Sequence, residues 1–336
     1  MKQAVLGLMR MTGAFATCRL ANRRKVLILT YHRFSAHEAE GAVSASLFAR
    51  QLAYLRAHYT IVPLSAVERH LTAGDRLPYP AVALTIDDGY RDAYEIAFSI
   101  LRRFDAPATL FAVSDFIDGK CWLWTDKVRY IVDQTKTDRV SANVAGSVIE
   151  MALNGSASRR EAEGRVKAVL KSADDHVKEE AIESLAEQTG VELPRRPPPD
   201  CGPVTWDELR EMDAGGVEIG SHTVTHPILP RVDRKRLIGE LRTSRRRLEE
   251  MLDHEVSLFC YPNGDYDRQV RDEVERAGYR LAVTAQPGMN AAGCDPLSLR
   301  RIHTEFDVAH FIQTTSGFEQ LKTSVRRSIR RRAAEQ

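Results

Sequence analysis

Ala81-Val-Ala-Leu-Thr-Ile-Asp-Asp-Gly-Tyr90 is the stretch that decides the fold of this 336-residue chain. It begins after Pro80 as a short apolar run, the pattern of a strand that is buried on both faces. It ends in two adjacent carboxylates, and a turn at Gly89 can bring Asp87 and Asp88 to the same strand mouth. One carboxylate could then bind a metal ion while the other accepts protons. Asp-Asp-Gly is also an ordinary turn, so the metal interpretation needs ligands from elsewhere in the chain.

Strands and helices alternate on both sides of this stretch, apart from one interruption. We expect strands at residues 26–31, 59–62, 81–86, 108–113, 217–221, 256–260, 281–284 and 299–304, and helices at 46–58, 65–71, 92–103, 205–214, 233–252, 267–277 and from 308 onward. Such alternation predicts a parallel sheet. The polar residues that follow strands directly are Asp87, Asp88, His222, His226, Pro262 and His303. An open sheet would gather its ligands at one crevice, whereas this many strand ends favour an α/β barrel.

The alternation breaks between about residues 115 and 203. This segment contains Cys121-Trp-Leu-Trp124, a helix that starts near residue 125, a charged helical stretch at 159–187 and the polyproline-like Pro194-Arg-Arg-Pro-Pro-Pro199. We interpret it as a mostly helical insertion packed beside the barrel mouth, with a small helical domain as the alternative.

The composition is that of a globular protein with a sizeable core. Hydrophobic residues make up 43% of the chain and charged residues 28%, and the length suits one large α/β domain or two ordinary ones. Lysine and arginine number 48 against 46 aspartate and glutamate residues, so the net charge of +2 indicates no particular partner, and we expect no nucleic acid. Five scattered cysteines without a CxxC pair argue against a disulfide framework and favour a reducing compartment.

Two arginine clusters depart from the even charge distribution, with four arginines at 242–247 and five at 326–332. We interpret them as a solvated helix face and a basic tail, with weak contact between the basic termini and anionic membrane lipids as the alternative. The N-terminal MKQAVLGLMRMTGAF makes a poor signal peptide, because Arg10 ends an apolar run of six residues. We therefore expect a cytoplasmic protein, with membrane association as the open alternative.

Ser221-His-Thr-Val-Thr-His226 supplies the further ligands that a metal site needs. Two histidines four residues apart lie on one face of a helical turn, as two ligands of one ion require. By itself this spacing is weak evidence, since two surface histidines are the ordinary explanation. Together with Asp88 it gives two histidines and one carboxylate, a set that leaves positions open for water and substrate. The set suits Zn²⁺, and Fe²⁺, Co²⁺ or Ni²⁺ are chemically conceivable.

At these motifs the sequence resembles the polysaccharide deacetylase family, also called NodB-like or carbohydrate esterase family 4. Three motifs carry the resemblance in the family's order: Thr85-Ile-Asp-Asp-Gly89, Ser221-His-Thr-Val-Thr-His226 and Phe259-Cys-Tyr-Pro-Asn-Gly264. Tyr31-His-Arg33 and Leu299-Arg-Arg-Ile-His303 look like its flanking motifs. The resemblance covers roughly residues 26–304 apart from the insertion. It implies a distorted (β/α)7 barrel, a divalent metal and the removal of N- or O-acetyl groups from sugars.

The resemblance also implies a role for each matching residue. Asp87 matches the catalytic base, and Asp88, His222 and His226 match the metal ligands. His303 matches the general acid, with a structural histidine hydrogen-bonded at the end of its strand as the alternative. The candidates for substrate contact are His32, Tyr261, Pro262, Asn263 and Gly264, of which Pro262 to Gly264 match a groove-wall loop whose backbone N–H helps to stabilise the oxyanion. For His32, a hydrogen-bonded structural histidine at the strand end is the alternative.

Two departures from the family pattern concern how Asp87 is held. Cys260 stands where many members have an arginine, and Val283-Thr-Ala-Gln-Pro-Gly288 stands where an Asp-Trp motif is expected. Neither departure touches the three metal ligands.

The sequence thus predicts a metal-dependent deacetylase that hydrolyses N-acetyl groups of amino sugars in a polysaccharide or glycan precursor. The alternatives are a metal hydrolase of a small non-sugar amide on the same fold and a catalytically silent glycan-binding module. Trp122 and Trp124 are either sugar-stacking rings or anchors of the insertion's own core. We divide the chain into a basic segment at 1–25, the barrel with its insertion at 26–305, and a helix with a basic tail at 306–336.

Overall fold

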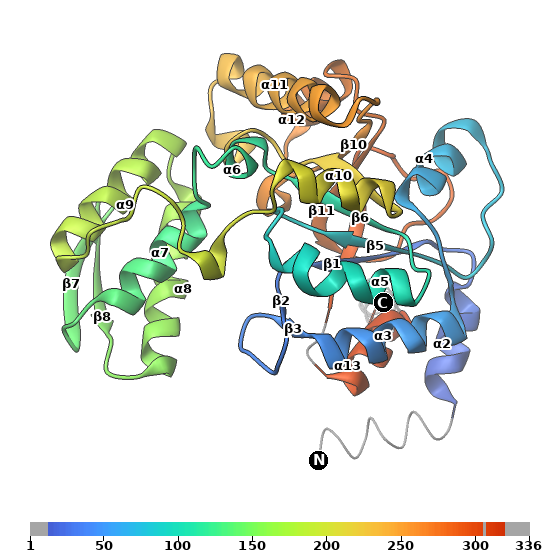
Figure 1. Cartoon of the computed structure of the whole chain (residues 1–336), viewed down its shortest axis with the longest axis horizontal. Helices are drawn as coiled ribbons and strands as arrows, with labels where there is room; N and C mark the ends of the chain where they lie inside the picture. The colour runs from blue at the N-terminus through green and yellow to red at the C-terminus, as the bar shows by residue number, and fades with distance from the viewer. Residues whose placement is uncertain (1–12, 305–306, 320–336) are drawn as a thin grey trace, which may run out of the picture.

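The computed structural model describes residues 13–304 and 307–319 and shows parallel strands closed into a seven-membered ring. The ring runs β1-β12-β11-β10-β9-β6-β5 and closes because β1 pairs with β5 as well as with β12. Helices surround this ring, and the insertion forms a lobe on one side of it (Figure 1). The predicted α/β barrel with parallel strands is confirmed.

The elements of the barrel part follow the expected alternation closely. The ring strands are β1 (Leu27–Tyr31), β5 (Ala81–Ile86), β6 (Ala108–Ala112), β9 (Val217–Ser221), β10 (Leu258–Cys260), β11 (Leu281–Pro287) and β12 (Leu299–His303), with the shorter β2 (Phe34–Ser35), β3 (Val43–Ser44) and β4 (Thr60–Ile61) outside it. The helices are α2 (Ala14–Asn22), α3 (Ala45–His58), α4 (Leu64–Ala73), a π-helix (Ala93–Phe98) that continues into α5 (Ser99–Arg103), α10 (Trp206–Ala214), α11 (Arg234–Leu252), α12 (Arg268–Arg276) and α13 (Val308–Thr315). Single 3₁₀ turns occupy Leu229–Arg231 and Pro262–Gly264.

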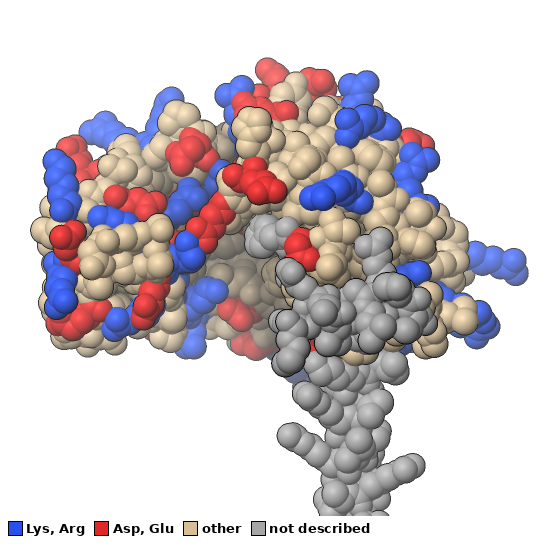
Figure 2. All heavy atoms as spheres, turned by 90° about the horizontal axis from the view of Figure 1, so that it is seen from below, with Lys and Arg blue, Asp and Glu red and all other residues tan. Residues whose placement is uncertain are grey.

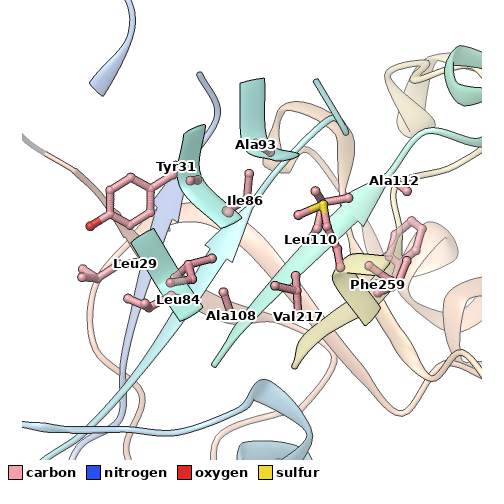
Figure 3. Packing of buried hydrophobic residues seen from close by; sticks show 14 of the residues in the cluster. Leu29, Tyr31, Leu84, Ile86, Ala93, Ala108, Leu110, Ala112, Val217 and Phe259 are labelled. Atoms are coloured by element: carbon pink, nitrogen blue, oxygen red, sulfur yellow. The ribbon is translucent and has the colours of Figure 1, made fainter. Parts of the chain in front are cut away.

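Alternate residues of each ring strand pack on opposite faces of the sheet. One set forms the apolar filling of the barrel and includes Ile28, Ala81, Ala83, Phe111, Leu258, Val283 and Leu299. The other set packs against the surrounding helices and includes Leu29, Leu84, Ile86, Leu110, Val217 and Phe259 (Figure 3). Asp87 follows Ala81 and Ala83 in steps of two, so it continues the row that points into the barrel.

The insertion folds around a hydrophobic core of its own. Its elements are α6 (Ser114–Ile117), α7 (Trp124–Gln134), β7 (Arg139–Val144), β8 (Ser147–Ala152), α8 (Ser156–Ser172), α9 (Asp175–Thr189) and a 3₁₀ turn at Pro199–Cys201. The antiparallel β7-β8 hairpin was not predicted. Trp124 is 2% exposed and belongs to this core, while Trp122 is 5% exposed and donates to the carbonyl of Pro194 at 3.2 Å. Both rings are therefore structural anchors, and the sugar-stacking interpretation is wrong.

Of the two arginine clusters in the sequence, the structure describes only the one at 242–247. In the 242–247 cluster on α11, three arginines form ion pairs with Glu249, Glu250 and Asp118. Across residues 13–304 and 307–319, every helix is too short or too polar to traverse a lipid bilayer. The first twelve residues and the 326–332 cluster lie outside the described residues, so membrane contact through the basic termini stays a prediction.

Candidate functional site

β5 delivers two carboxylates to the barrel mouth through a tight turn. The amide of Gly89 donates to the carbonyl of Asp87 at 3.0 Å, and Asp88 between them adopts a φ of +78°. A non-glycine residue in this left-handed region is uncommon and persists where its surroundings fix it. Gly89 has a φ of +88°, so the predicted turn at Gly89 is confirmed, and the left-handed backbone begins one residue earlier, at Asp88. Both carboxylates are buried at the mouth, with Asp87 2% and Asp88 7% exposed.

The two histidines come from the loop after β9, and this loop is not helical. Thr223 and His226 have φ angles of +72° and +59°, so the predicted helical turn is wrong. The imidazoles converge nonetheless, with ring centroids 4.8 Å apart. The Nε2 atoms of His222 and His226 lie 3.4 and 3.5 Å from Oδ1 of Asp88.

This arrangement of Asp88, His222 and His226 fits a divalent cation. One ligand atom from each side chain lies within 4.8 Å of the other two, and all three side chains are buried. Oδ1 of Asp88 is buried and accepts no hydrogen bond from the described residues, which is costly for a carboxylate unless a cation compensates it. Nδ1 of His222 lies 2.7 Å from the carbonyl of Cys260, a contact that orients the ring and leaves Nε2 for the ion.

The two imidazoles differ in how readily they bind a proton, and a bound proton prevents binding of a metal ion at the same nitrogen. Burial, followed by the neighbouring His222, lowers the pKa of His226 to about 3, so this ring is neutral and can donate a lone pair. For His222, burial lowers the pKa, but Cys260 and Asp88 outweigh burial and raise it overall. A metal ion therefore competes with a proton at His222, and metal affinity should fall in acid.

Arg301 holds Asp87, although the sequence did not single it out. Its Nη1 and Nη2 donate to Oδ1 and Oδ2 of Asp87 at 2.7 Å each, and both side chains are buried. Nη2 also lies 3.2 Å from Sγ of Cys260. Burial alone would raise the pKa of Asp87, but the charge and hydrogen bonds of Arg301 outweigh burial, so this pKa lies well below its ordinary value. The arginine missing at position 260 is thus supplied by β12, and Asp87 is ionised.

His32 and His303 lie at the rim of the same mouth. Nε2 of His32 is 3.7 Å from Oδ2 of Asp87, and the rings of His32 and His303 stack with centroids 6.2 Å apart. His303 follows Arg301 by two residues on β12, so it shares the inward face of that strand and is exposed at its end. Burial, then the nearby His32 and Arg301, lower the pKa of His303.

These residues coincide with a known family pattern. The family model described as polysaccharide deacetylase matches residues 74–148 and 161–282, which is more than half of the chain and includes Asp87, Asp88, His222 and His226. The chain belongs to the polysaccharide deacetylase family.

Other members of the polysaccharide deacetylase family share the fold at low identity. The Streptococcus pyogenes deacetylase PplD, solved in complex with acetate, has a TM-score of 0.59 and 20% identity, covering 87% of this chain and 98% of that one. IcaB from Ammonifex degensii has a TM-score of 0.58 and 20% identity, covering 86% of this chain and 97% of that one.

Two curated relatives match over shorter segments. The Bacillus subtilis protein YxkH is 26% identical over 99 residues, 30% of this chain. The poly-beta-1,6-N-acetyl-D-glucosamine N-deacetylase of Escherichia coli is 36% identical over 78 residues, 23% of this chain. The chain spans 36% of the length of YxkH and 12% of the length of the Escherichia coli protein.

The third motif of this deacetylase family member forms a 3₁₀ turn after β10. Asn263 has a φ of +55° and Gly264 a φ of +75°. A Cβ on Gly264 would lie 2.2 Å from the backbone nitrogen of Ala285, so only glycine fits there. The turn Pro262–Gly264 is therefore tightly built at a strand end of the barrel, and its role as a groove wall stays a prediction.

Tyr261, in contrast, faces away from the site. Its ring is fully buried and stacks on Tyr266, its hydroxyl donates to the carbonyl of Leu297 at 2.8 Å, and its amide donates to the carbonyl of Val283 at 3.1 Å. The expected substrate contact of Tyr261 is wrong, because both of its donors are engaged inside the fold.

A cleft of about 1240 Å³ lies between the barrel and the insertion, and none of the three metal ligands lines it. In Figure 2 it is the hollow between the two lobes, with basic and acidic side chains around it. Its charged lining residues are Glu38, Glu40, Asp126, Asp133, Glu163, Arg50, Arg129, Arg159, Arg160 and Lys167, so basic and acidic groups balance. Asp126 connects it to the β5 turn by accepting a hydrogen bond from the hydroxyl of Tyr90 at 2.7 Å.

Proposed function

We propose that this protein is a metal-dependent deacetylase that hydrolyses the N-acetyl groups of amino sugars in a glycan. The observation that carries the proposal is the buried Asp88, His222 and His226 set directly beside the ionised Asp87. Membership of the polysaccharide deacetylase family supports it, as does the similarity to a relative named for N-deacetylation of poly-N-acetylglucosamine. Zn²⁺ is the proposed ion, because one carboxylate and two imidazoles are a common zinc ligand set.

The residues of the site divide the reaction among them. A divalent ion held by Asp88, His222 and His226 would polarise the acetyl carbonyl and lower the pKa of a water molecule. Asp87, kept ionised by Arg301, takes the proton of the attacking water. His303 gives a proton to the leaving nitrogen, since an amine is a poor leaving group without one.

His32 and the Pro262–Gly264 turn are proposed to contact the substrate. A backbone N–H of the turn would help to stabilise the oxyanion. The cleft between the barrel and the insertion, about 1240 Å³ in volume, is large enough for more than a single sugar, and we propose that it accommodates further units of an oligomer.

Hydrolysis of N-acetylglucosamine oligomers tests this proposal. Purified protein loaded with Zn²⁺ should release equal amounts of acetate and free amine from the oligomers, more slowly from the monosaccharide, and not from a small non-sugar acetamide. Binding of the oligomer without release of acetate, at full metal content, would favour a silent glycan-binding module. Preference for the small amide would favour the other hydrolase alternative.

Arg301→Met is expected to raise the pH at which activity begins. Without the guanidinium, burial dominates and raises the pKa of Asp87, so the acid limb of kcat/KM moves to higher pH. In the wild type, the pKa of Asp87 is lower in the folded than in the unfolded state, and this difference stabilises the folded protein. The stabilisation is fully present above the ordinary aspartate pKa of about 3.9 and is lost as the pH falls through the folded-state pKa of Asp87. Removing one partner of such a buried pair costs about 3–5 kcal/mol of unfolding free energy at neutral pH.

Profiles of kcat/KM against pH and urea unfolding measure the two effects of Arg301→Met. Arg300→Met is the matched control, because Arg300 is the exposed neighbour on the same strand. An unchanged acid limb in fully metal-loaded Arg301→Met protein would contradict the assigned role.

His303→Ala is expected to retain the metal ion and to lower kcat/KM for amides by roughly 10²-fold or more, since it removes a general acid. An acid must be protonated to act, so wild-type kcat/KM should decline as pH rises through the pKa of His303. That pKa lies below its ordinary value of about 6.5. The variant should lose this alkaline decline and should hydrolyse an activated acetate ester almost normally. Equal losses on ester and amide, with the alkaline limb intact, would instead indicate His32 as the acid.

A further inference from the structure

The loop that carries both metal-binding histidines is held on one side by Glu240 of α11. Oε2 of Glu240 accepts hydrogen bonds from the amides of Val224 at 2.8 Å and Thr225 at 2.9 Å, and Oε1 accepts one from Oγ1 of Thr225 at 2.6 Å. Glu240 is 5% exposed. Hydrogen bonds to an ionised acceptor are stronger than neutral ones, so three of them on one buried carboxylate fix the centre of the loop.

The backbone of this loop requires such support. Thr223 is a β-branched residue with a φ of +72°, which is a genuine outlier, and His226 has a φ of +59°. Strained residues of this kind persist where the surrounding structure over-determines them. Val224 and Thr225, which Glu240 binds, are the two residues between them. Glu240 therefore binds the segment that leads from Thr223 to His226.

The other side of the loop is held by the first residues of the insertion. The amide of Ser114 donates to the carbonyl of Thr223 at 3.2 Å, and the amide of Asp115 donates to the carbonyl of Val224 at 3.0 Å. The loop is thus fixed between α11 and the start of the insertion, through its amides on one side and its carbonyls on the other.

The insertion also reaches Glu240 from a second direction. Asp175, the first residue of α9, lies 2.6 Å from Nη2 of Arg236 on α11, and Arg236 in turn lies 3.8 Å from Glu240. The other carboxylate oxygen of Asp175 accepts from Lys178 at 2.5 Å. Asp175 and Lys178 are 3% and 2% exposed, and the Lys178 ammonium lies over the ring of Trp124. This buried pair has no part in the proposed chemistry, but it links the core of the insertion to the residue beside Glu240.

We propose that Glu240 is a positioning residue for the metal ligand His226, and that Asp175 supports it through Arg236. The insertion is then part of the framework of the metal centre and not only a neighbour of the substrate. This inference rests on the proposed function in one respect, namely that Asp88, His222 and His226 bind a divalent ion.

The Zn²⁺ affinity of the full-length protein, measured by competition with a chromophoric chelator, tests this inference. Glu240→Gln replaces one carboxylate oxygen, which accepts hydrogen bonds from the loop, by an amide nitrogen, which cannot accept them. The variant should bind Zn²⁺ about 10–100-fold more weakly, because loss of a group that supports a metal ligand commonly has an effect of this size. Arg236→Met keeps Glu240 and should weaken binding several-fold. Glu250→Gln is the matched control, because Glu250 is exposed on the same helix and pairs with Arg246 at the surface. It should leave the affinity unchanged.

Amide hydrogen exchange provides a second readout that does not depend on metal or turnover. The amides of Val224 and Thr225 should exchange faster in Glu240→Gln, while those of the barrel strands should not change. If the wild-type protein bound no divalent ion, the proposed function would fail and the metal part of this inference with it. If the wild type bound Zn²⁺ and Glu240→Gln matched it in affinity and in exchange, this inference alone would be overturned. Unchanged affinity in Arg236→Met would overturn the link to the insertion.

Discussion

His222→Ala should release the divalent ion and abolish deacetylation. The protein supplies three ligands, and the remaining Asp88 and His226 would hold the ion with one carboxylate and one imidazole. Loss of a residue that merely orients a ligand commonly costs 10–100-fold in affinity, so loss of a ligand should cost more than about 10²-fold. Without the ion, neither the carbonyl nor the water is activated. Metal content after dialysis and acetate release from N-acetylglucosamine oligomers measure the two losses.

A matched control and a reversal make this result specific. His254→Ala removes an exposed histidine that pairs with Asp213 on the outside of the barrel, and should change neither metal content nor rate. Chelation of the wild-type protein should reproduce the His222→Ala phenotype, and added Zn²⁺ should restore the wild type but not the variant. Full activity of the wild type after exhaustive chelation would overturn the metal dependence.

Asp87→Asn should separate the metal from the chemistry. The variant keeps Asp88, His222 and His226 and should therefore keep the ion. An amide cannot accept the proton of the attacking water, so turnover should fall roughly 10²–10⁴-fold. Asp88→Asn should show the converse pattern, with weakened metal binding as its primary defect. If both variants retained metal and rate, the division of roles between the two carboxylates would be wrong.

The partner of Asp87 complicates its replacement and also supplies a control. Asp87→Asn leaves the Arg301 guanidinium buried without its anion, which costs about 3–5 kcal/mol of unfolding free energy. The double variant Asp87→Asn/Arg301→Gln removes both charges and should recover much of that stability. It should not recover turnover, because no base is present. A stable but inactive double variant would show that the lost activity of Asp87→Asn is not a consequence of misfolding.

The barrel could be predicted because several of its strands carry one or both of two local signals. An apolar run marks the strand, and a polar residue directly after it marks the mouth, as where Asp87 and Asp88 follow Ala81–Ile86. These signals need no knowledge of which strands pair. The same signals predicted that Asp88, His222 and His226 lie close together, because the carboxyl ends of parallel strands meet at one edge of the sheet.

The features that were missed depend on side-chain direction or on backbone strain. Arg301 shares the inward face of its strand with His303, so the alternation of β12 relative to His303 could have distinguished it from Arg300. The hairpin turn has Ala145 at a φ of +49° before Gly146 at +82°. Asn-Gly is the usual signal for such a turn, and alanine conceals it. In the His222–His226 loop, the amide of Val224 donates to Glu240. The sequence around Glu240 does not indicate this hydrogen bond.

Closure of the ring by β12 has a consequence for the order in which the polypeptide is made. β12 pairs with β1 across the seam, and it also carries Arg301. Asp88, His222 and His226 all emerge from the ribosome before this strand, and long proteins form native-like intermediates during synthesis. A nascent chain could therefore assemble the ligand set while Asp87 still lacks its cation and the seam is open. Hydrolytic competence should arise only once translation has passed β12, because this strand brings the Arg301 guanidinium that binds Asp87.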